Sequence, residues 1–204
     1  MGNVFLTSNG FCSESIKKVF LRHVKENLSN PKAVIITTAS PYKENNKYAI
    51  KAKSDLIEMG IDQVDFLDVE YENPTKLQQY NIVYINGGNP FNLLHHIKKS
   101  KAESILKDLA KQSVIFVGVS AGAVVLGPSI EVVNYFTPAM NNTNMVDFTA
   151  LSITEKAIFP HYDREDIFQD SLGKTIEERL NLFEEDNNCS IIRLTDEEYL
   201  LIDV

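Results

Sequence analysis

Short, almost entirely apolar runs alternate with amphipathic segments along most of this chain. Three such runs are Asn3–Thr7, Ala33–Thr37 and Ile82–Ile85, and a fourth, Val114–Val117, precedes a glycine-rich turn. Strands buried on both faces have continuous apolar runs, whereas half-solvated strands alternate apolar and polar residues. Strands that alternate with helices favour a mostly parallel sheet with helices on both faces. The sequence therefore predicts an α/β protein.

The segments between these runs have apolar residues at helical spacing. Helices are predicted over residues 16–24, Tyr48–Met59, Pro90–Lys98, Ala102–Lys111 and Ser120–Leu126. Later in the chain we expect strands at Val64–Leu67, Ser152–Ile158 and Ser190–Val204, a helix over Lys174–Glu185 and a loop over Asn134–Asn144. Because no repeat or linker interrupts the 204 residues, we expect one α/β domain over residues 1–204.

The charge and the cysteine content indicate which binding partners and which cellular compartment to expect. The formal net charge is −8 and no block of Lys or Arg stands out, so nucleic acid and membrane are not expected partners. The two cysteines, Cys12 and Cys189, make a disulfide framework improbable. The N-terminus lacks the pattern of a secretion signal, and no apolar stretch approaches the roughly 20 residues that span a bilayer. We therefore expect a cytoplasmic protein.

The strongest chemical signal is the pentapeptide Gly118-Val119-Ser120-Ala121-Gly122, a G-x-S-x-G match. It follows a predicted strand and opens a predicted helix, which is the context of a nucleophile elbow. Small residues are required there because helix and strand pass close beside a sharp turn. A serine at a helix N-terminus faces free N–H groups that favour negative charge on the reacting oxygen. Without chemistry, the same pattern would be a buried turn of small residues.

A serine nucleophile needs two hydrogen-bond donors for the developing oxyanion. The N–H of Ala121, directly after the serine, is the first candidate. The second is the N–H of Gly88, since a glycine lets the backbone approach a substrate carbonyl. Gly88 lies in a turn after the strand Ile82–Ile85, and Pro90 starts the next helix, so a plain turn is an equally good interpretation.

His161 is the candidate general base among the four histidines. It follows Pro160 at the end of a predicted strand, and ligands bind at strand ends of such sheets. An imidazole suits proton transfer from serine at neutral pH. His23, His95 and His96 fall within predicted helices, where a solvated surface histidine is the better interpretation. His161 could also be an ordinary loop histidine, but its place after a nucleophile elbow favours catalysis.

A third residue should hold the imidazole in the correct tautomer. By analogy with other hydrolases we expect a carboxylate between Ser120 and His161. Glu131 is the first candidate, Asp147 the second, and Glu155 also falls in the interval. Each could equally be a surface charge.

Taken together, these motifs resemble those of peptidase E, the aspartyl dipeptidase family, and of the related cyanophycinases. The four counterparts occur in the family's order and span roughly residues 3–192. They are Gly87-Gly88-Asn89, Ser120-Ala121-Gly122-Ala123, Pro160-His161 and Gly173-Lys174-Thr175-Ile176-Glu177-Glu178-Arg179.

The resemblance implies a three-layer α/β/α sandwich like class I glutamine amidotransferases, of the flavodoxin-like kind. It implies a serine peptidase (a hydrolase) acting on short peptides, with no metal and no cofactor. Ser120 would be the nucleophile and His161 the base, with Gly88 and Ala121 as oxyanion donors. We add Asn89 and Lys174 as expected substrate-binding residues.

Two positions depart from the family pattern. The family acid lies fifteen residues beyond the serine, where this chain has Tyr135. Glu131, four residues earlier, is the proposed substitute. The family also has an arginine after the threonine of the last motif, suited to pairing with a substrate aspartate, and here that residue is Ile176. A strict preference for N-terminal aspartate is therefore not expected, since the nearby Lys174 is only a point charge.

Two alternative functions remain open on the sequence. An esterase of the α/β-hydrolase kind is less consistent, because His161 comes early and no HGGG-type loop is present. A non-catalytic small-molecule binder of the same fold is favoured by Tyr135 at the expected acid position. The sequence does not fix the oligomeric state, and a homodimer is one assembly that we consider.

Overall fold

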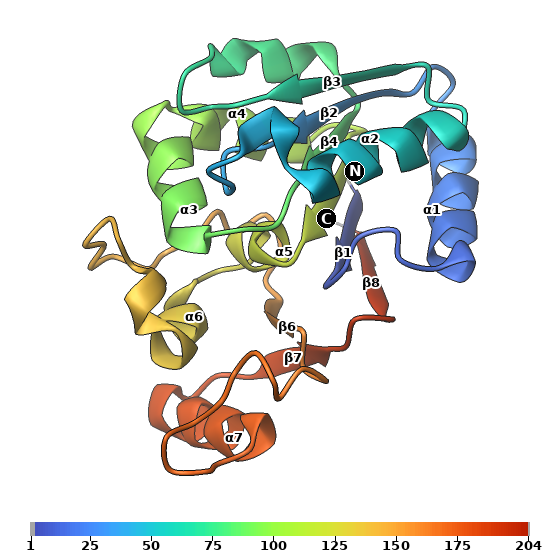
Figure 1. The fold of residues 1–204 in the computed structure, drawn as a ribbon. Helices are drawn as coiled ribbons and strands as arrows, with labels where there is room; N and C mark the ends of the chain where they lie inside the picture. The colour runs from blue at the N-terminus through green and yellow to red at the C-terminus, as the bar shows by residue number, and fades with distance from the viewer. Residues whose placement is uncertain (1–2, 204) are drawn as a thin grey trace.

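A six-stranded sheet forms the centre of the molecule in the computed structural model, which describes residues 3–203 (Figure 1). The strand order is β3-β2-β4-β5-β1-β8. Its strands are β1 (Asn3–Thr7), β2 (Lys32–Ile36), β3 (Gln63–Leu67), β4 (Ile82–Ile85), β5 (Ile115–Val119) and β8 (Tyr199–Asp203). Every pairing is parallel except that of β8 with β1. The mostly parallel sheet predicted from the apolar runs is confirmed.

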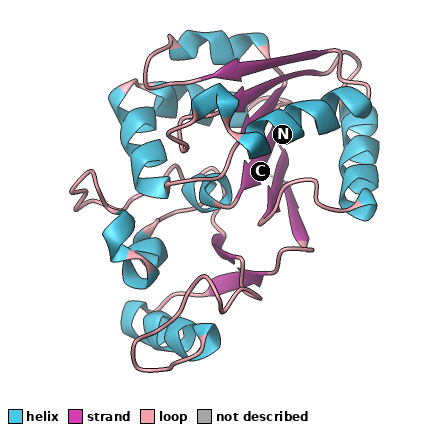
Figure 2. Cartoon of the chain, in the orientation of Figure 1, coloured by secondary structure: helices cyan, strands magenta, loops and turns pink. Residues whose placement is uncertain are grey.

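Helices cover both faces of this sheet (Figure 2). One face packs against α1 (Glu14–Asn27) and α2 (Lys47–Glu58), whose apolar sides are centred on Phe20 and Leu56. The other face packs against α3 (Pro90–Lys99), α4 (Ala102–Ala110) and α5 (Ala121–Leu126). The three-layer α/β/α arrangement is thus confirmed.

Short 3-10 turns connect several of these elements, at Lys43–Asn45, Pro74–Gln79 and Pro138–Met140. Among residues 3–203, no helix combines the length and the apolar character needed to cross a membrane.

A second, two-stranded parallel sheet lies beside the main one and is formed by β6 (Ala157–Pro160) and β7 (Ile191–Leu194). Together with α6 (Glu131–Phe136) and α7 (Ile176–Asn187) it encloses a small apolar core of its own (Figure 1). This core is built from Val132, Phe136, Phe159, Ile176, Leu180, Phe183 and Ile191. We call this part of the molecule the small unit; whether the chain forms one domain stays a prediction.

The helix α7 begins where the last sequence motif predicts. Thr175 caps it, and Glu178 returns the contact to the Thr175 backbone, which completes a capping box. Arg179 is buried and donates to the carbonyls of Phe168 and Phe136. The motif therefore has a structural role: it starts the helix, and Arg179 holds the preceding loop against the small unit.

Three predicted segments differ in the structure. The strand expected at Ser152–Ile158 is confined to β6, because residues 152–154 donate instead to carbonyls at the end of α5. The loop expected at Asn134–Asn144 contains the end of α6, which packs its apolar residues in the small unit. The strand region Ser190–Val204 is split between β7 and β8, in different sheets, and Val204 lies outside the described residues.

Candidate active site

Ser120 occupies the sharp turn between β5 and α5. Its backbone has φ 50° and ψ −112°, a conformation that non-glycine residues rarely adopt. The surroundings hold it there, since its N–H donates to the Thr7 carbonyl of the adjacent strand at 2.9 Å. A strained serine between a strand and a helix is the geometry of a nucleophile elbow.

The two glycines that flank Ser120 are required by close packing. A Cβ at Gly122 would lie 2.1 Å from the Ile85 carbonyl oxygen. A Cβ at Gly118 would lie 2.7 Å from the Leu126 side chain and 2.8 Å from the Ala123 backbone. Neither position has room for a larger residue, as the sequence pattern indicates.

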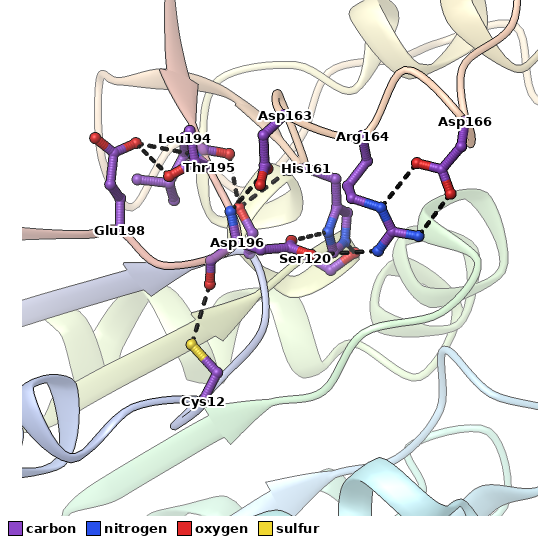
Figure 3. Close-up of polar contacts among 11 residues, drawn as sticks. Cys12, Ser120, His161, Asp163, Arg164, Asp166, Leu194, Thr195, Asp196 and Glu198 are labelled. Atoms are coloured by element: carbon purple, nitrogen blue, oxygen red, sulfur yellow. Dashed lines mark hydrogen bonds and ion pairs between the residues drawn. The ribbon is translucent and has the colours of Figure 1, made fainter.

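His161 follows β6 and extends toward the serine from the small unit. Its Nε2 atom lies 2.9 Å from Ser120 Oγ (Figure 3). The residue has φ 58°, and its N–H donates to the buried Ser8 hydroxyl at 3.0 Å. The structure therefore brings together the serine and the histidine that the sequence singles out.

The other imidazole nitrogen contacts a carboxylate that our sequence reasoning missed. Asp196 Oδ1 lies 2.5 Å from His161 Nδ1, so Ser120, His161 and Asp196 form one continuous hydrogen-bonded chain. The side chains of His161 and Asp196 are 21% and 16% exposed. The chain of contacts is therefore partly shielded from solvent but remains accessible from the surface.

The pairing of β6 with β7 explains why these two residues meet. The last residues of the two strands, Pro160 and Leu194, are partners in a parallel register. The segments that leave the strands consequently emerge side by side, one with His161 and the other with Asp196. The buried Ser8 hydroxyl donates to the Leu194 carbonyl at 2.8 Å while it accepts from His161, which links both strand ends to β1.

The structure does not bring Glu131, our predicted acid, to His161. Glu131 is exposed at the start of α6, and its N–H donates to Ser129 Oγ. Asp147, the second candidate, pairs with Lys98 at 3.2 Å. The acid position beside the imidazole is filled by Asp196, which corrects the prediction.

The error has an identifiable cause. The prediction places the acid between Ser120 and His161, although the chain order of such residues varies between folds. A usable signal was present, because Asp196 follows a short apolar run closely, as His161 does. Only the parallel pairing of β6 with β7 brings the two residues together, and this pairing is a tertiary contact that the sequence does not show.

The loop after β4 lies against Ser120. A Cβ at Gly87 would lie 3.1 Å from Ser120 Cβ and 3.6 Å from its Oγ. Gly88 has φ 145°, and a Cβ there would lie 2.4 Å from the Ala39 carbonyl oxygen, so only glycine fits. Within residues 3–203, neither the Gly88 N–H nor the Ala121 N–H donates to another protein group.

The two residues expected to bind substrate have different surroundings. The Asn89 side chain caps α3 by accepting from two N–H groups, and its Nδ2 donates to the Met140 carbonyl. These contacts give Asn89 a structural role at the start of α3, and substrate binding by Asn89 stays a prediction. Lys174 is exposed just before α7. Ile176, at the position of the family arginine, is fully buried in the small unit.

One cation, Arg164, contacts the Asp196 carboxylate. Arg164 Nη1 lies 3.4 Å from Asp196 Oδ2, and the same guanidinium makes two contacts to Asp166. The contact with Asp166 raises the pKa of Arg164 and lowers that of Asp166. Cys12 donates to the Asp196 carbonyl oxygen, and burial raises the pKa of its thiol. Among residues 3–203, no cluster of His, Cys, Asp or Glu could hold a metal ion.

The fold and the site together define a class of protein. It is an α/β protein with a strained serine at the carboxyl edge of a mostly parallel sheet, next to an imidazole that is paired with a carboxylate.

Comparison with known proteins narrows the class to a family. The family model described as "Peptidase family S51" matches residues 4–203, so this chain belongs to peptidase family S51. An uncharacterized peptidase of Listeria monocytogenes is 30% identical over 169 residues, which cover 80% of this chain and 79% of that protein. Peptidase E of Streptomyces coelicolor is 26% identical over 160 residues, covering 78% of this chain and 64% of its own length.

A solved structure supports the same assignment. The crystal structure of a Listeria monocytogenes protein, provisionally assigned as a peptidase E, superposes with a TM-score of 0.70 at 26% identity. The superposition covers 100% of this chain and 99% of that one. The expected membership of the peptidase E family is therefore confirmed, and the chain is a member of a peptidase family.

Proposed function

We propose that this protein is a serine peptidase that hydrolyses short peptides through an acyl-enzyme. Ser120 is the nucleophile, His161 the general base and Asp196 the acid that orients it. The observation that carries the proposal is the unbroken series of contacts from Ser120 Oγ through both imidazole nitrogens to Asp196 Oδ1.

The direction of proton transfer follows from the chemistry of the three groups. An ionised carboxylate only accepts hydrogen bonds, so the His161 nitrogen that faces Asp196 carries the proton. The other nitrogen, Nε2, is left with a lone pair directed at the Ser120 hydroxyl, 2.9 Å away. Attack of Ser120 Oγ on a substrate carbonyl then transfers the hydroxyl proton to Nε2.

The remaining steps use the same groups. The tetrahedral oxyanion accepts from the N–H groups of Gly88 and Ala121, at the start of α5. Collapse of the intermediate expels the amine of the leaving amino acid, which takes the proton from His161. A water that is deprotonated by His161 then hydrolyses the ester on Ser120 and frees the enzyme.

The proposed substrate class is small peptides, without a strict aspartyl preference. The arginine that would pair with an aspartate is replaced by Ile176, which is fully buried. Lys174 is the exposed cation in this motif and remains our candidate for a substrate contact. A reducing, cytoplasmic setting is proposed as well, since Cys12 and Cys189 are both free thiols.

A fluorophosphonate probe tests the proposal directly. We expect the probe to phosphonylate wild-type protein at a single serine and to leave Ser120→Ala unlabelled. A matched control is Ser104→Ala, an exposed position in α4, which should be labelled like wild type. A dipeptide library should then show turnover by wild type and by Ser104→Ala but not by Ser120→Ala. No labelling of folded wild type would instead favour a non-catalytic binder.

A further inference from the structure

Asp196 has partners for all four of its polar atoms. Oδ1 faces His161, Oδ2 faces Arg164 Nη1, the backbone N–H donates to Asp163 Oδ1 at 2.9 Å, and the carbonyl accepts from Cys12 at 3.1 Å. Two of these partners, Asp163 and Arg164, lie two and three residues after His161 in the chain. The loop that carries the imidazole therefore also holds the carboxylate (Figure 3).

The contact to Oδ2 controls how the carboxylate is turned. Rotation about the last bond of an aspartate is broad, so a single contact at Oδ1 leaves its orientation loose. A second contact at Oδ2 removes this freedom. Arg164 is suited to the task because its guanidinium is itself fixed: Nε and Nη2 each donate to Asp166, both at 2.8 Å. A planar fork held at one edge presents its third nitrogen in a defined direction.

The ion pair that holds Arg164, its contact with Asp166, is expected to contribute little to folding stability. The side chains of Arg164 and Asp166 are 40% and 64% exposed, and exposed ion pairs have small effects on stability. A structural role is therefore a poor explanation for an arginine that is paired on both sides next to the catalytic carboxylate.

On the basis of the proposed function, we propose that Arg164 is a positioning residue. Held by Asp166, it keeps the Asp196 carboxylate turned toward His161 and limits how strongly the carboxylate favours the protonated imidazole.

The charges around Asp196 determine in which direction the His161 titration midpoint moves when Arg164 is replaced. Asp163, Glu197 and Glu198 are acidic, Cys12 is a neutral thiol, and Arg164 is the cation in direct contact. Loss of the Arg164 charge leaves the anionic groups unopposed and favours the protonated imidazole. His161 should then titrate at a higher pH.

NMR titration of the histidine imidazoles tests this without any need for turnover. The His161 signal is assigned by its loss in His161→Gln. We expect its midpoint to rise by about half a pH unit or more in Arg164→Gln. Arg164→Lys, which keeps the charge, should titrate close to wild type. Arg22→Gln, which removes an exposed arginine from α1, should titrate as wild type does.

Kinetics separate positioning from substrate binding. Arg164→Gln should lower kcat on the order of tenfold with little change in KM, and the acidic limb of kcat/KM should move upward with the NMR midpoint. Arg164→Lys should recover part of the loss, because it restores the charge without the planar fork.

Three results would overturn the positioning role. They are an unchanged His161 midpoint in Arg164→Gln, an increase in KM alone, and a fall in Tm many degrees beyond that of Arg22→Gln, which would mark a structural residue. Failure of the proposed function is recognised separately, since wild type would then not react with the fluorophosphonate probe.

Discussion

Backbone strain marks the two residues that meet at the centre of the site. Ser120 and His161 both have positive φ, near 50° and 58°. Non-glycine residues in this region cost about 1–3 kcal/mol each and persist where the surroundings over-determine them. Here the constraints are visible: the Ser120 N–H is held by the Thr7 carbonyl, and the His161 N–H by the Ser8 hydroxyl.

The acid assignment can be tested by a pair of isosteric substitutions. Asp196→Asn should lower kcat by about 10³- to 10⁴-fold, because an amide can stabilise the wrong imidazole tautomer and removes the charge that stabilises the imidazolium. Glu131→Gln should leave kcat within about twofold, since Glu131 is exposed at the start of α6. The measurement is kcat on a dipeptide cleaved by wild type. Equal losses in both variants would contradict the assignment.

At the level of elements, the site depends on three strand ends from two sheets. Ser120 follows β5, while His161 and the turn with Asp196 follow β6 and β7. The helix α7 covers the small sheet and is tied to β7 by Arg193, which pairs with Glu177 at 3.0 Å and with Glu184 at 2.6 Å. These ion pairs therefore stabilise the small unit, which carries His161 and Asp196.

Low pH should weaken the ion pairs of Arg193 and so destabilise the small unit. Arg193 lowers the pKa of both Glu177 and Glu184 below the ordinary value of 4.5. Carboxylates with a lowered folded-state pKa stabilise the fold above their unfolded-state pKa, and this contribution is lost as pH falls through the folded-state values. We expect the stabilisation to be complete above about pH 5 and to disappear as the pH falls below 4.5.

Thermal unfolding of Arg193→Met measures the effect. At pH 7 the variant should lose about 1 kcal/mol, because Glu177 is largely exposed and only Glu184 is well shielded. The difference in Tm from wild type should shrink as pH is lowered from 5 to 3. Arg22→Met, on the exposed surface of α1, serves as the control. A difference that stays constant over this range would rule out the ion pairs as its source.

At the scale of the whole molecule, the proposed mechanism requires the small unit to stay docked on the main sheet. Ser8 is central to this docking, because its buried hydroxyl joins the end of β1 to both β6 and β7. A single hydroxyl therefore connects the sheet that carries Ser120 with the sheet that carries His161 and Asp196.

Replacing Ser8 should affect stability and reactivity together. Ser8→Ala leaves the His161 N–H without its partner and removes one of the two donors to the Leu194 carbonyl, which still accepts from the Tyr162 N–H. The loss should cost about 1–2 kcal/mol of unfolding free energy. The rate of fluorophosphonate labelling should also fall, because His161 loses a constraint on its strained backbone. Ser104→Ala, which removes an exposed hydroxyl, should change neither quantity. Normal labelling in a destabilised Ser8→Ala would show that docking does not depend on this hydroxyl.

The amino-acid sequence by itself determined the α/β class, the strands of the parallel sheet, the nucleophile elbow at Ser120 and the histidine at His161. These features are local, since they follow from apolar periodicity, turn glycines and the residues next to them. Only the tertiary structure decided that Asp196 and not Glu131 faces the imidazole, because that contact depends on the parallel pairing of two strands more than 30 residues apart. The split of the last strands and the short helix α6 were decided in the same way, by packing against distant parts of the chain.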